Sequence, residues 1–203
     1  MAGKIISAFL ALILLSVASL AAADEETVRV TMTTSQGVIE IDLYLDKAPI
    51  SAGKFLRLVD GQHLDGGSFY RVITYDNDNG NSRIEMIQGG LDDERESSFE
   101  PIAHETTEQT GILHKDGVIS MARGDVGTAS SEFFICLGDQ PGLDFGNVCN
   151  PDEQGFAAFG RVMSGVVVVR RINQSPADAP SESDYTKGQI LTDPVVIISG
   201  LLL

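Results

Sequence analysis

The feature that most constrains the fold is a series of short apolar runs, each bounded by glycine, asparagine, aspartate or proline. The runs after residue 67 are SFYRVI, IEMIQ, GVISMA, SEFFICL, FAAFGRV and PVVIIS. Short runs rich in branched and aromatic residues and separated by turn-forming residues are typical of β-strands. Many such strands in succession predict an antiparallel barrel or sandwich.

A hairpin and a helix are predicted before these runs. Apolar and polar residues alternate over 28–34 and again over 38–44, and the SQG turn signal at 35–37 separates the two runs. This period of two around a short turn predicts a β-hairpin. Pro49 suits the first position of a helix, because its missing N–H would be unpaired there anyway. One helical face is then formed by Ala52, Phe55, Leu56 and Val59.

The first residues have the layout of a secretory signal peptide. Lys4 precedes an apolar run from residue 5 to residue 20, and the small residues of ASLAAADEE follow. A basic start, an apolar core and a small-residue site predict cleavage after Ala23, whereas a membrane anchor would need about 20 apolar residues. We therefore expect a signal peptide at 1–23, one domain at 24–203, and a protein that is exported to the periplasm or secreted.

The charge of the chain limits its partners. The formal net charge is −15, and removal of Lys4 with the signal peptide makes it more negative. Such a protein is repelled by nucleic acid phosphates and by anionic membranes. We expect no nucleic-acid partner, no membrane association after signal cleavage, and a monomer. The C-terminal PVVIISGLLL is too short to cross a bilayer and is interpreted as a last strand.

Cysteine and histidine spacings give no metal site. Cys136 and Cys149 are an even pair in a chain expected to be exported, so they form either a disulfide or two free thiols. Their spacing fits neither a metal site nor a redox pair. The histidines, at 63, 104 and 114, lack the helical spacing of a zinc site.

Two other sites are excluded by their patterns. The stretch DNDNGNS at 76–82 is as polar as a calcium loop, but counting from Asp76 puts Asn81 where an EF-hand needs glycine and Ile87 where it needs glutamate. Serine, histidine and aspartate residues are present, yet no Gly-x-Ser-x-Gly elbow surrounds any serine. We expect neither a metal nor a cofactor.

Several strand runs carry side chains that suit one pocket. Met86 and Gln88 lie two apart on a strand and therefore share a face. Other runs supply one arginine and several apolar groups, namely Arg71, Ala122, Phe134 and Leu143. An apolar pocket with one arginine and one glutamine suits a small apolar ring joined to a peptide amide.

The order of these motifs resembles the cyclophilin family of peptidyl-prolyl cis-trans isomerases. The matching motifs are F-x-R-V-I, M-x-Q-G-G, G-V-I-S-M-A, S-x-F-F-I, L-D and F-G-R-V. The resemblance implies a closed eight-stranded antiparallel β-barrel capped by two α-helices. It places the second helix in SGVVVVRRINQ at 164–174, where branched residues alone favour a strand. We follow the resemblance there, since tertiary context overrides local preference.

The resemblance also implies a function and its residues. The function is isomerisation of X–Pro bonds in Pro-containing polypeptides during folding of exported proteins. Arg71 matches the catalytic arginine, and Gln88 matches the glutamine that binds the substrate backbone. The substrate-binding positions match Met86, Phe134 and Leu143 in the pocket wall, Ala122 and the Arg123 backbone along the peptide, and Glu85 and Phe156.

Five positions depart from the family pattern. Glu85 and Gly142 replace aromatic residues, Arg123 replaces asparagine, Glu132 replaces glutamine, and Phe156 replaces a histidine of eukaryotic members. Because cyclosporin uses the aromatic side chain that Gly142 replaces, this glycine predicts weak cyclosporin binding. Glu85 either pairs with the catalytic arginine or points outward.

These departures leave two alternative functions open. One alternative is a module that binds Pro-containing segments but isomerises them poorly. A lipocalin-like barrel with a ligand inside is another, although small barrels are usually packed.

Overall fold

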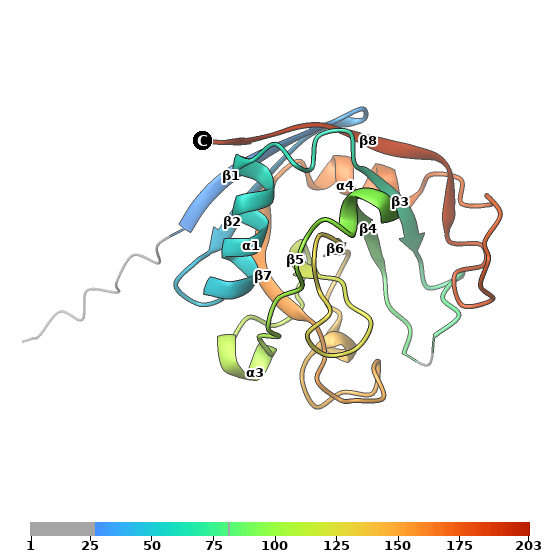
Figure 1. The fold of residues 1–203 in the computed structure, drawn as a ribbon. Coiled ribbons are helices and arrows are strands. Elements are labelled where there is room, and N and C mark those ends of the chain that lie inside the picture. The colour runs from blue at the N-terminus through green and yellow to red at the C-terminus, as the bar shows by residue number, and fades with distance from the viewer. Residues whose placement is uncertain (1–26, 81) are drawn as a thin grey trace, which may run out of the picture.

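The computed structural model describes residues 27–80 and 82–203, so the predicted signal peptide lies outside the described residues. Eight strands form a closed barrel in the order β1-β2-β7-β5-β6-β4-β3-β8, and all neighbouring pairs are antiparallel (Figure 1). The strands are β1 Thr27–Thr34, β2 Gly37–Tyr44, β3 Ser68–Ile73, β4 Met86–Gly90, β5 Val118–Met121, β6 Phe133–Cys136, β7 Ala157–Ser164 and β8 Ile190–Leu202. The predicted fold class is confirmed.

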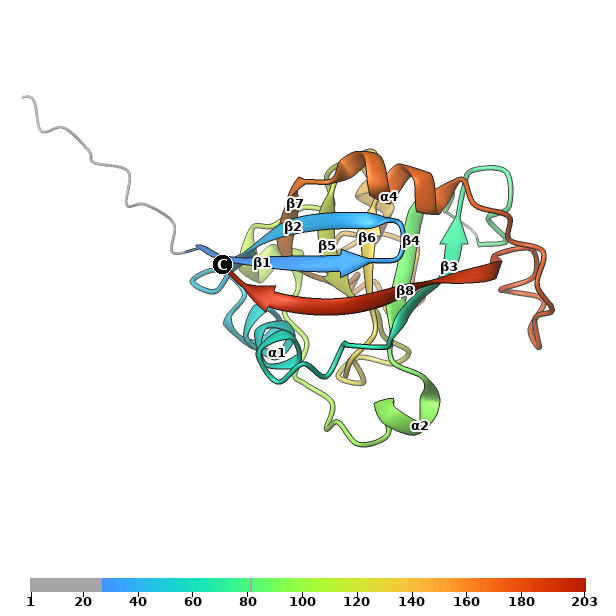
Figure 2. The same ribbon diagram turned by 90° about the horizontal axis from the view of Figure 1, so that it is seen from above.

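Two helices longer than one turn occur among the described residues. These helices, α1 (Pro49–Asp60) and α4 (Val166–Asn173), lie at opposite edges of the layer formed by β1, β2 and β8, with α4 beyond β2 and α1 beyond β8 (Figure 2). The loops contain shorter elements, namely α2 (Asp93–Glu96), α3 (Thr107–Thr110) and the 3-10 helix η1 (Pro141–Leu143).

Helix α4 shows why local preference fails in this segment. The chain enters it through Gly165, whose φ of 86° belongs to the left-handed region, and a Cβ there would lie 2.3 Å from the Val38 carbonyl oxygen. The helix then buries one face, formed by Val168, Val169 and Ile172. Burial of this apolar stripe against the barrel outweighs the modest strand preference of branched residues.

Helix α1 begins at Pro49 as predicted, but the buried face differs slightly from the predicted one. Leu58 is 1% exposed, whereas Leu56 is only partly buried against the core. The face toward the barrel is completed by Ala52, Phe55 and Val59.

The barrel interior is filled by aromatic side chains. Phe55 of α1 packs against Phe133 and Phe159 at ring distances of 5.2 Å, and Phe69 lies 5.6 Å from Phe133. All four rings are fully buried. This packed interior argues against a lipocalin-like barrel that carries a ligand inside.

A bulge in β3 decides which side chains face outward. Phe69 pairs with Gly89 and Arg71 pairs with Gln88, so Tyr70 is one extra residue on its strand. Phe69 belongs to the interior core, while Tyr70 and Arg71 both line hollows on the outer surface. A bulge re-aims side chains in this way, because the extra residue breaks the strict alternation of faces.

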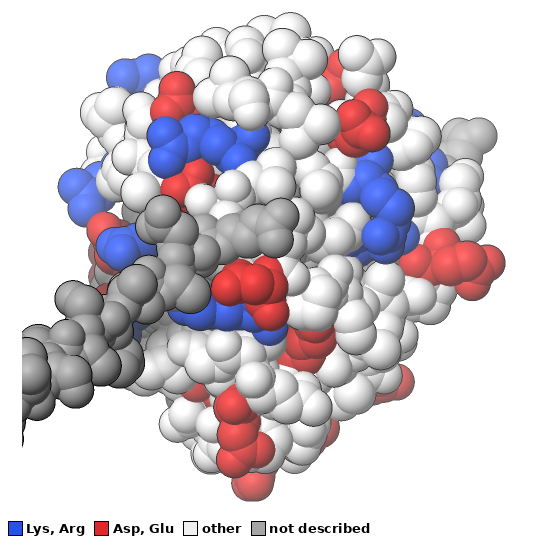
Figure 3. Space-filling model, turned by 90° about the vertical axis from the view of Figure 1, so that its left-hand side faces the viewer, with Lys and Arg blue, Asp and Glu red and all other residues white. Residues whose placement is uncertain are grey.

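The surface is mixed in charge. On the face drawn in Figure 3, acidic and basic side chains are interspersed. Within the described ranges, no helix is long and apolar enough to span a membrane. No cluster of three or more His, Cys, Asp or Glu residues in these ranges is placed to hold a metal ion.

Candidate active site

A small apolar pocket lies on the outer side of the barrel wall. Its volume is about 140 Å³, and its apolar lining consists of Ile84, Met86, Phe134 and Leu143, which are 1–6% exposed. Strands β4 and β6 supply Met86 and Phe134, and η1 supplies Leu143. The remaining lining residues are Arg71, Gln88, Ala122, Arg123, Cys149, Asn150, Phe156 and Tyr185. All the predicted site residues except Glu85 therefore surround one pocket.

The pocket floor rests on a buried polar network. Phe156 meets the Phe134 ring edge to face at 5.3 Å, and the His114 ring stacks beneath Phe134 at 5.9 Å. His114 Nδ1 lies 2.7 Å from an Asp144 carboxylate oxygen, and its Nε2 lies 3.0 Å from the Ser120 hydroxyl. Although this order of groups occurs in hydrolase triads, Ser120 is fully buried and no substrate reaches it. The network fixes the floor.

Arg71 is the cation at the edge of this pocket. Its guanidinium donates hydrogen bonds from Nε and Nη2 to Gln189 Oε1, at 3.0 and 2.6 Å, and from Nη1 to Gln88 Oε1 at 3.1 Å. Arg71 is 8% exposed, and the Tyr185 ring lies 5.1 Å from its Cζ atom. Both hydrogen-bond acceptors are neutral amides, so the positive charge is held in place without being neutralised by them.

The side-chain amide of Gln88 is oriented by Tyr70 and Glu132, which bind its NH2 group on the side away from Arg71. Its Nε2 donates to the Tyr70 hydroxyl at 2.8 Å and to a Glu132 carboxylate oxygen at 3.1 Å. Because an ionised carboxylate only accepts, Glu132 fixes the NH2 group on its side and leaves Gln88 Oε1 for Arg71. Tyr70 also donates to Glu132, at 2.6 Å, and its burial together with this carboxylate raises the pKa of Tyr70.

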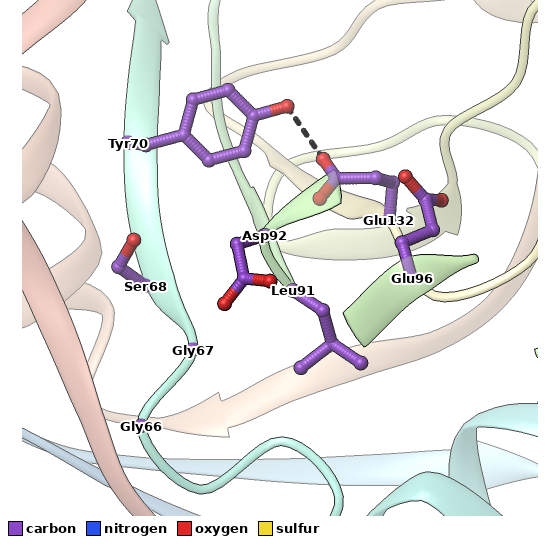
Figure 4. Close-up of a pocket in the computed structure, with 8 residues that line it drawn as sticks. All are labelled: Gly66, Gly67, Ser68, Tyr70, Leu91, Asp92, Glu96 and Glu132. Atoms are coloured by element: carbon purple, nitrogen blue, oxygen red, sulfur yellow. Dashed lines mark hydrogen bonds between the residues drawn. The ribbon is translucent and has the colours of Figure 1, made fainter. Parts of the chain in front are cut away.

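A larger hollow lies beside the pocket rather than over Arg71. It has a volume of about 710 Å³, and its walls include Tyr70, Asp92, Glu96 and Glu132. Figure 4 shows the Tyr70 hydroxyl directed at Glu132 across this hollow. Size alone would select it as the site, but the small pocket is the one that contains a buried cation beside an apolar wall. We therefore assign the chemistry to the small pocket.

The guanidinium of Arg123 binds other groups of the protein rather than facing the pocket opening. Its side chain is 1% exposed; it donates to the Gly155 carbonyl oxygen at 2.6 and 2.9 Å and forms a two-pronged ion pair with Asp152 at 2.7 and 2.8 Å. This pairing holds the pKa of Asp152 down to about 2. Arg123 also lies 5.3 Å from the Phe156 ring. Its side chain thus fastens the 147–155 loop to the pocket.

The structure also explains the glycine at 142. A Cβ atom there would meet the Ser82 Oγ at 2.4 Å. Ser82 therefore lies where many cyclophilins, by the resemblance above, carry an aromatic side chain.

Glu85 is the one predicted site residue that the structure does not place in the lining of the small pocket. The neighbouring Ile84 and Met86 take the inward positions because faces alternate along an extended chain. Burial raises the pKa of Glu85, and the charges that act on it are those of Arg170 and Asp76. Glu85 thus points away from Arg71, the second of the two orientations considered from sequence.

Both cysteines are free thiols in this structure. Cys136 is fully buried in the apolar layer behind the pocket, and Cys149 lines the pocket itself. Burial raises the pKa of both thiols.

Sequence reasoning missed several lining residues. Ile84 could have been found, because it precedes Met86 by two on the same strand face. Asn150 and Tyr185, which line the pocket, and Gln189, which binds Arg71 from behind it, lie in loops far along the chain from Arg71, and no spacing rule connects them to it.

Comparisons with known proteins identify the family of this chain. Residues 29–198 match the family described as cyclophilin type peptidyl-prolyl cis-trans isomerase/CLD. Peptidyl-prolyl cis-trans isomerase A of Dickeya dadantii is 30% identical over 207 residues, covering 100% of this chain and 99% of the relative. The peptidyl-prolyl cis-trans isomerase of Acinetobacter baylyi is 34% identical over 174 residues, covering 84% of this chain and 82% of that protein.

A solved structure shows the same fold. The crystal structure of a cyclophilin type isomerase from Cryptosporidium parvum has a TM-score of 0.65 at 19% identity, and the match covers 87% of this chain and 98% of that one. A further structure of that protein was obtained in the presence of the dipeptide Ala-Pro. The chain therefore belongs to the cyclophilin-type peptidyl-prolyl cis-trans isomerases, a family of enzymes.

Proposed function

We propose that this protein accelerates the cis–trans isomerisation of X–Pro bonds in exported polypeptides, with Arg71 as its catalytic residue. The observation that carries the proposal is a nearly buried guanidinium held at the edge of a small apolar pocket by neutral partners. The pocket accepts the proline ring, and the cation faces the bond beside it. The Ala-Pro dipeptide used with the Cryptosporidium parvum relative is consistent with such a ligand.

The chemistry follows from the amide bond. An X–Pro bond rotates over a barrier of about 18–20 kcal/mol, because the twisted state loses amide resonance. In that state the prolyl nitrogen becomes pyramidal and regains a lone pair. A positive donor beside this nitrogen binds the transition state more strongly than the planar ground state, and only such a difference accelerates the reaction.

Arg71 has donors left for this role. A guanidinium carries five N–H groups, and the contacts with Gln88 and Gln189 use one on each nitrogen. One N–H on Nη1 and one on Nη2 remain to meet the prolyl nitrogen. Gln88 holds the neighbouring substrate backbone, while the apolar wall, formed by Met86, Phe134, Leu143 and Phe156, binds the ring.

The proposal is tested by Arg71→Ala and Arg71→Lys in a proline-peptide isomerisation assay. We expect kcat/KM to fall on the order of 100-fold for the alanine variant, because a preorganised donor is lost. The kcat/KM of the lysine variant should lie between those of wild type and the alanine variant, since an ammonium keeps the charge but lacks the fixed arrangement of donors. Arg161→Ala is the matched control, because Arg161 is exposed on β7 outside the pocket. Equal rates for wild type and Arg71→Ala would refute the catalytic role.

The alternative of a poorly active binding module rests on Glu85, Gly142 and Phe156, and its Glu85 part requires this carboxylate to pair with Arg71. The charges acting on Glu85 are Arg170 and Asp76, which weakens that alternative. We expect Glu85→Gln to change kcat/KM by less than about twofold, since the residue is outside the pocket. NMR exchange spectroscopy on a Pro peptide separates the two functions, because a pure binder would hold the peptide without faster exchange.

Export is the second part of the proposal. It rests on the basic start, the apolar run and the small-residue site at 1–23. Expression of the full chain in a bacterial host, followed by intact mass measurement of the exported protein, should give a chain that begins at Asp24. A product that retains Met1 in the cytoplasm would overturn this part and leave the catalytic part unaffected.

A further inference from the structure

We propose that Gln189 is a positioning residue for the catalytic arginine, and that Asn77 and Asn79 of the polar 76–80 stretch hold Gln189 and its loop in place. The inference rests on the proposed catalytic role of Arg71. It starts from the one side chain that binds two nitrogens of the guanidinium at once, Gln189, which is fully buried and does not line the pocket.

The Gln189 amide can point in only one direction. Its Nε2 donates to the Asn77 backbone carbonyl oxygen at 2.8 Å, and a carbonyl oxygen only accepts. The amide oxygen is therefore turned toward Arg71, where it accepts from Nε at 3.0 Å and from Nη2 at 2.6 Å. Reversing the amide would set NH2 against the guanidinium and a carbonyl against a carbonyl, two repulsive contacts in a buried place.

The backbone of Gln189 is fixed as well. Its carbonyl oxygen accepts from the Val72 N–H at 2.8 Å, directly beside Arg71 on β3, and its own N–H donates to the Thr186 carbonyl oxygen at 3.1 Å. The amide group thus has little freedom relative to the strand that carries the arginine.

Asparagines of the polar stretch join two loops into one support. Asn77 Nδ2 donates to the Gly188 carbonyl oxygen at 2.9 Å and Asn79 Nδ2 donates to the carbonyl oxygens of Lys187 and Tyr185, at 2.9 and 3.2 Å. Asn77 Oδ1 also accepts from the Thr74 N–H at 2.7 Å. The stretch that fails as a calcium loop therefore binds the loop that carries Gln189.

The acceptors that hold Arg71, Gln88 and Gln189, are both neutral amides, and this has a physical reason. The guanidinium of Arg71 donates to Gln88 on one side and to Gln189 on the other. The NH2 group of Gln88 is fixed by Glu132, and the NH2 group of Gln189 is fixed by the Asn77 carbonyl oxygen. A carboxylate at either glutamine would also accept from the guanidinium, but it would neutralise the charge and lose the donor that fixes the other end of the amide. Neutral acceptors hold the donor fork in place and leave its charge for the transition state.

The test compares kcat and KM for Gln189→Ala with those for Gln140→Ala. Gln140 is a matched control, because it is 2% exposed and hydrogen-bonded to Leu137 but does not line the pocket. We expect Gln189→Ala to lower kcat about tenfold or more while KM changes less than about twofold, since misplacement of a catalytic group by about 1 Å costs up to 100-fold. Gln140→Ala should lose comparable thermal stability and keep its kcat.

A double-mutant cycle separates positioning from general destabilisation. In the Arg71→Ala background, Gln189→Ala should cause no further loss of kcat, because the arginine it positions is absent. In the NMR spectrum, the Arg71 Nε–H signal should shift in Gln189→Ala and stay in place in Gln140→Ala. If Gln189→Ala does not fold, Gln189→Met replaces it, because methionine fills a similar volume without an amide acceptor; its kcat should also fall, since Arg71 loses the bonds from Nε and Nη2.

The outcomes are distinguishable. Wild-type kcat in Gln189→Ala or Gln189→Met, with activity lost in Arg71→Ala, overturns the positioning role and leaves the proposed function standing. Equal losses in Gln189→Ala and Gln140→Ala, or additive losses in the double variant, also overturn it. Wild-type activity in Arg71→Ala refutes the proposed function itself.

Discussion

Phe133 and Phe134 are neighbours on β6, yet they belong to two different apolar clusters. Phe133 lies inside the barrel against Phe55 and Phe69, in the large core. Phe134 lies on the outer face, in a small cluster with Ile73, Ile84, Met86, Cys136 and Leu143. Alternation along a strand sends consecutive side chains to opposite faces, so one strand serves both clusters.

The difference between the clusters separates stability from function. The inner cluster is enclosed by the strands, α1 and α4, and four fully buried phenylalanine rings pack at its centre. The outer cluster is closed only partly, by η1 and by the 147–155 loop, and its open side holds Arg71 and Gln88. A packed barrel thus provides a rigid wall, and the binding site is built on the outside of that wall.

The largest expected effect is on the inner cluster. Phe133→Ala removes a fully buried ring that contacts two other phenylalanines, and we expect a loss of about 3–5 kcal/mol in the free energy of unfolding. Urea denaturation followed by circular dichroism measures this loss. The fraction that remains folded should keep a kcat/KM close to wild type.

The adjacent substitution should show the opposite pattern. Phe134→Ala removes a pocket wall, so we expect kcat/KM to fall on the order of tenfold or more, with a smaller loss of stability than Phe133→Ala. The same denaturation and isomerisation assays serve both variants. If the two variants lost stability and activity in the same proportion, the separation between the clusters would not hold.

A smaller effect should come from the loop that closes the outer cluster. Asp152 accepts from Arg123, and this bond lowers the pKa of Asp152 to about 2, below its unfolded value of 3.8. A carboxylate with a lowered folded pKa stabilises the protein fully above the unfolded pKa, and this contribution is lost as the pH falls through about 2. Wild type should therefore exceed Asp152→Asn in stability at neutral pH, and the difference should vanish in acid.

The effect of Asp152→Asn on activity has a matched control. Asp139→Asn removes the carboxylate of an exposed ion pair with Lys115, away from the pocket. We expect Asp152→Asn, but not Asp139→Asn, to lower kcat/KM at neutral pH, because only the former frees the 147–155 loop. A difference between wild type and Asp152→Asn that stayed constant down to pH of about 2 would contradict the assignment of this ion pair.

The smallest effect concerns thiol chemistry. Cys149 lines the pocket and Cys136 is fully buried, and burial raises the pKa of both thiols. A thiol reagent should label Cys149 slowly at neutral pH and faster as the pH rises, because the thiolate reacts. Cys136 should react only after unfolding. Peptide mass mapping reads both sites, and a Pro peptide should protect Cys149; labelling of Cys136 first would contradict the assignment of the two thiols.

Much of this fold follows from local patterns. The hairpin of β1 and β2, the start of α1 at Pro49 and the short strands were predicted from alternation and turn residues, and the structure confirms them. Helix α4 was predicted only through the family resemblance, because its branched residues favour a strand. Most pocket residues were grouped from the strand runs, whereas Arg123, Phe156 and the roles of all the site residues came from that resemblance, and these roles stay predictions.

The sequence by itself determined which residue types were available: an arginine beside aromatic residues on one strand, and Met-x-Gln on another. Only the tertiary structure decided how they face one another. The bulge at Tyr70 turns Arg71 outward, and the alternation at Ile84 turns Glu85 away. Gln189 reaches Arg71 from 118 residues further along the chain. Such contacts depend on strand register and loop packing, which are set by burial over the whole barrel and not by the neighbours of any one residue.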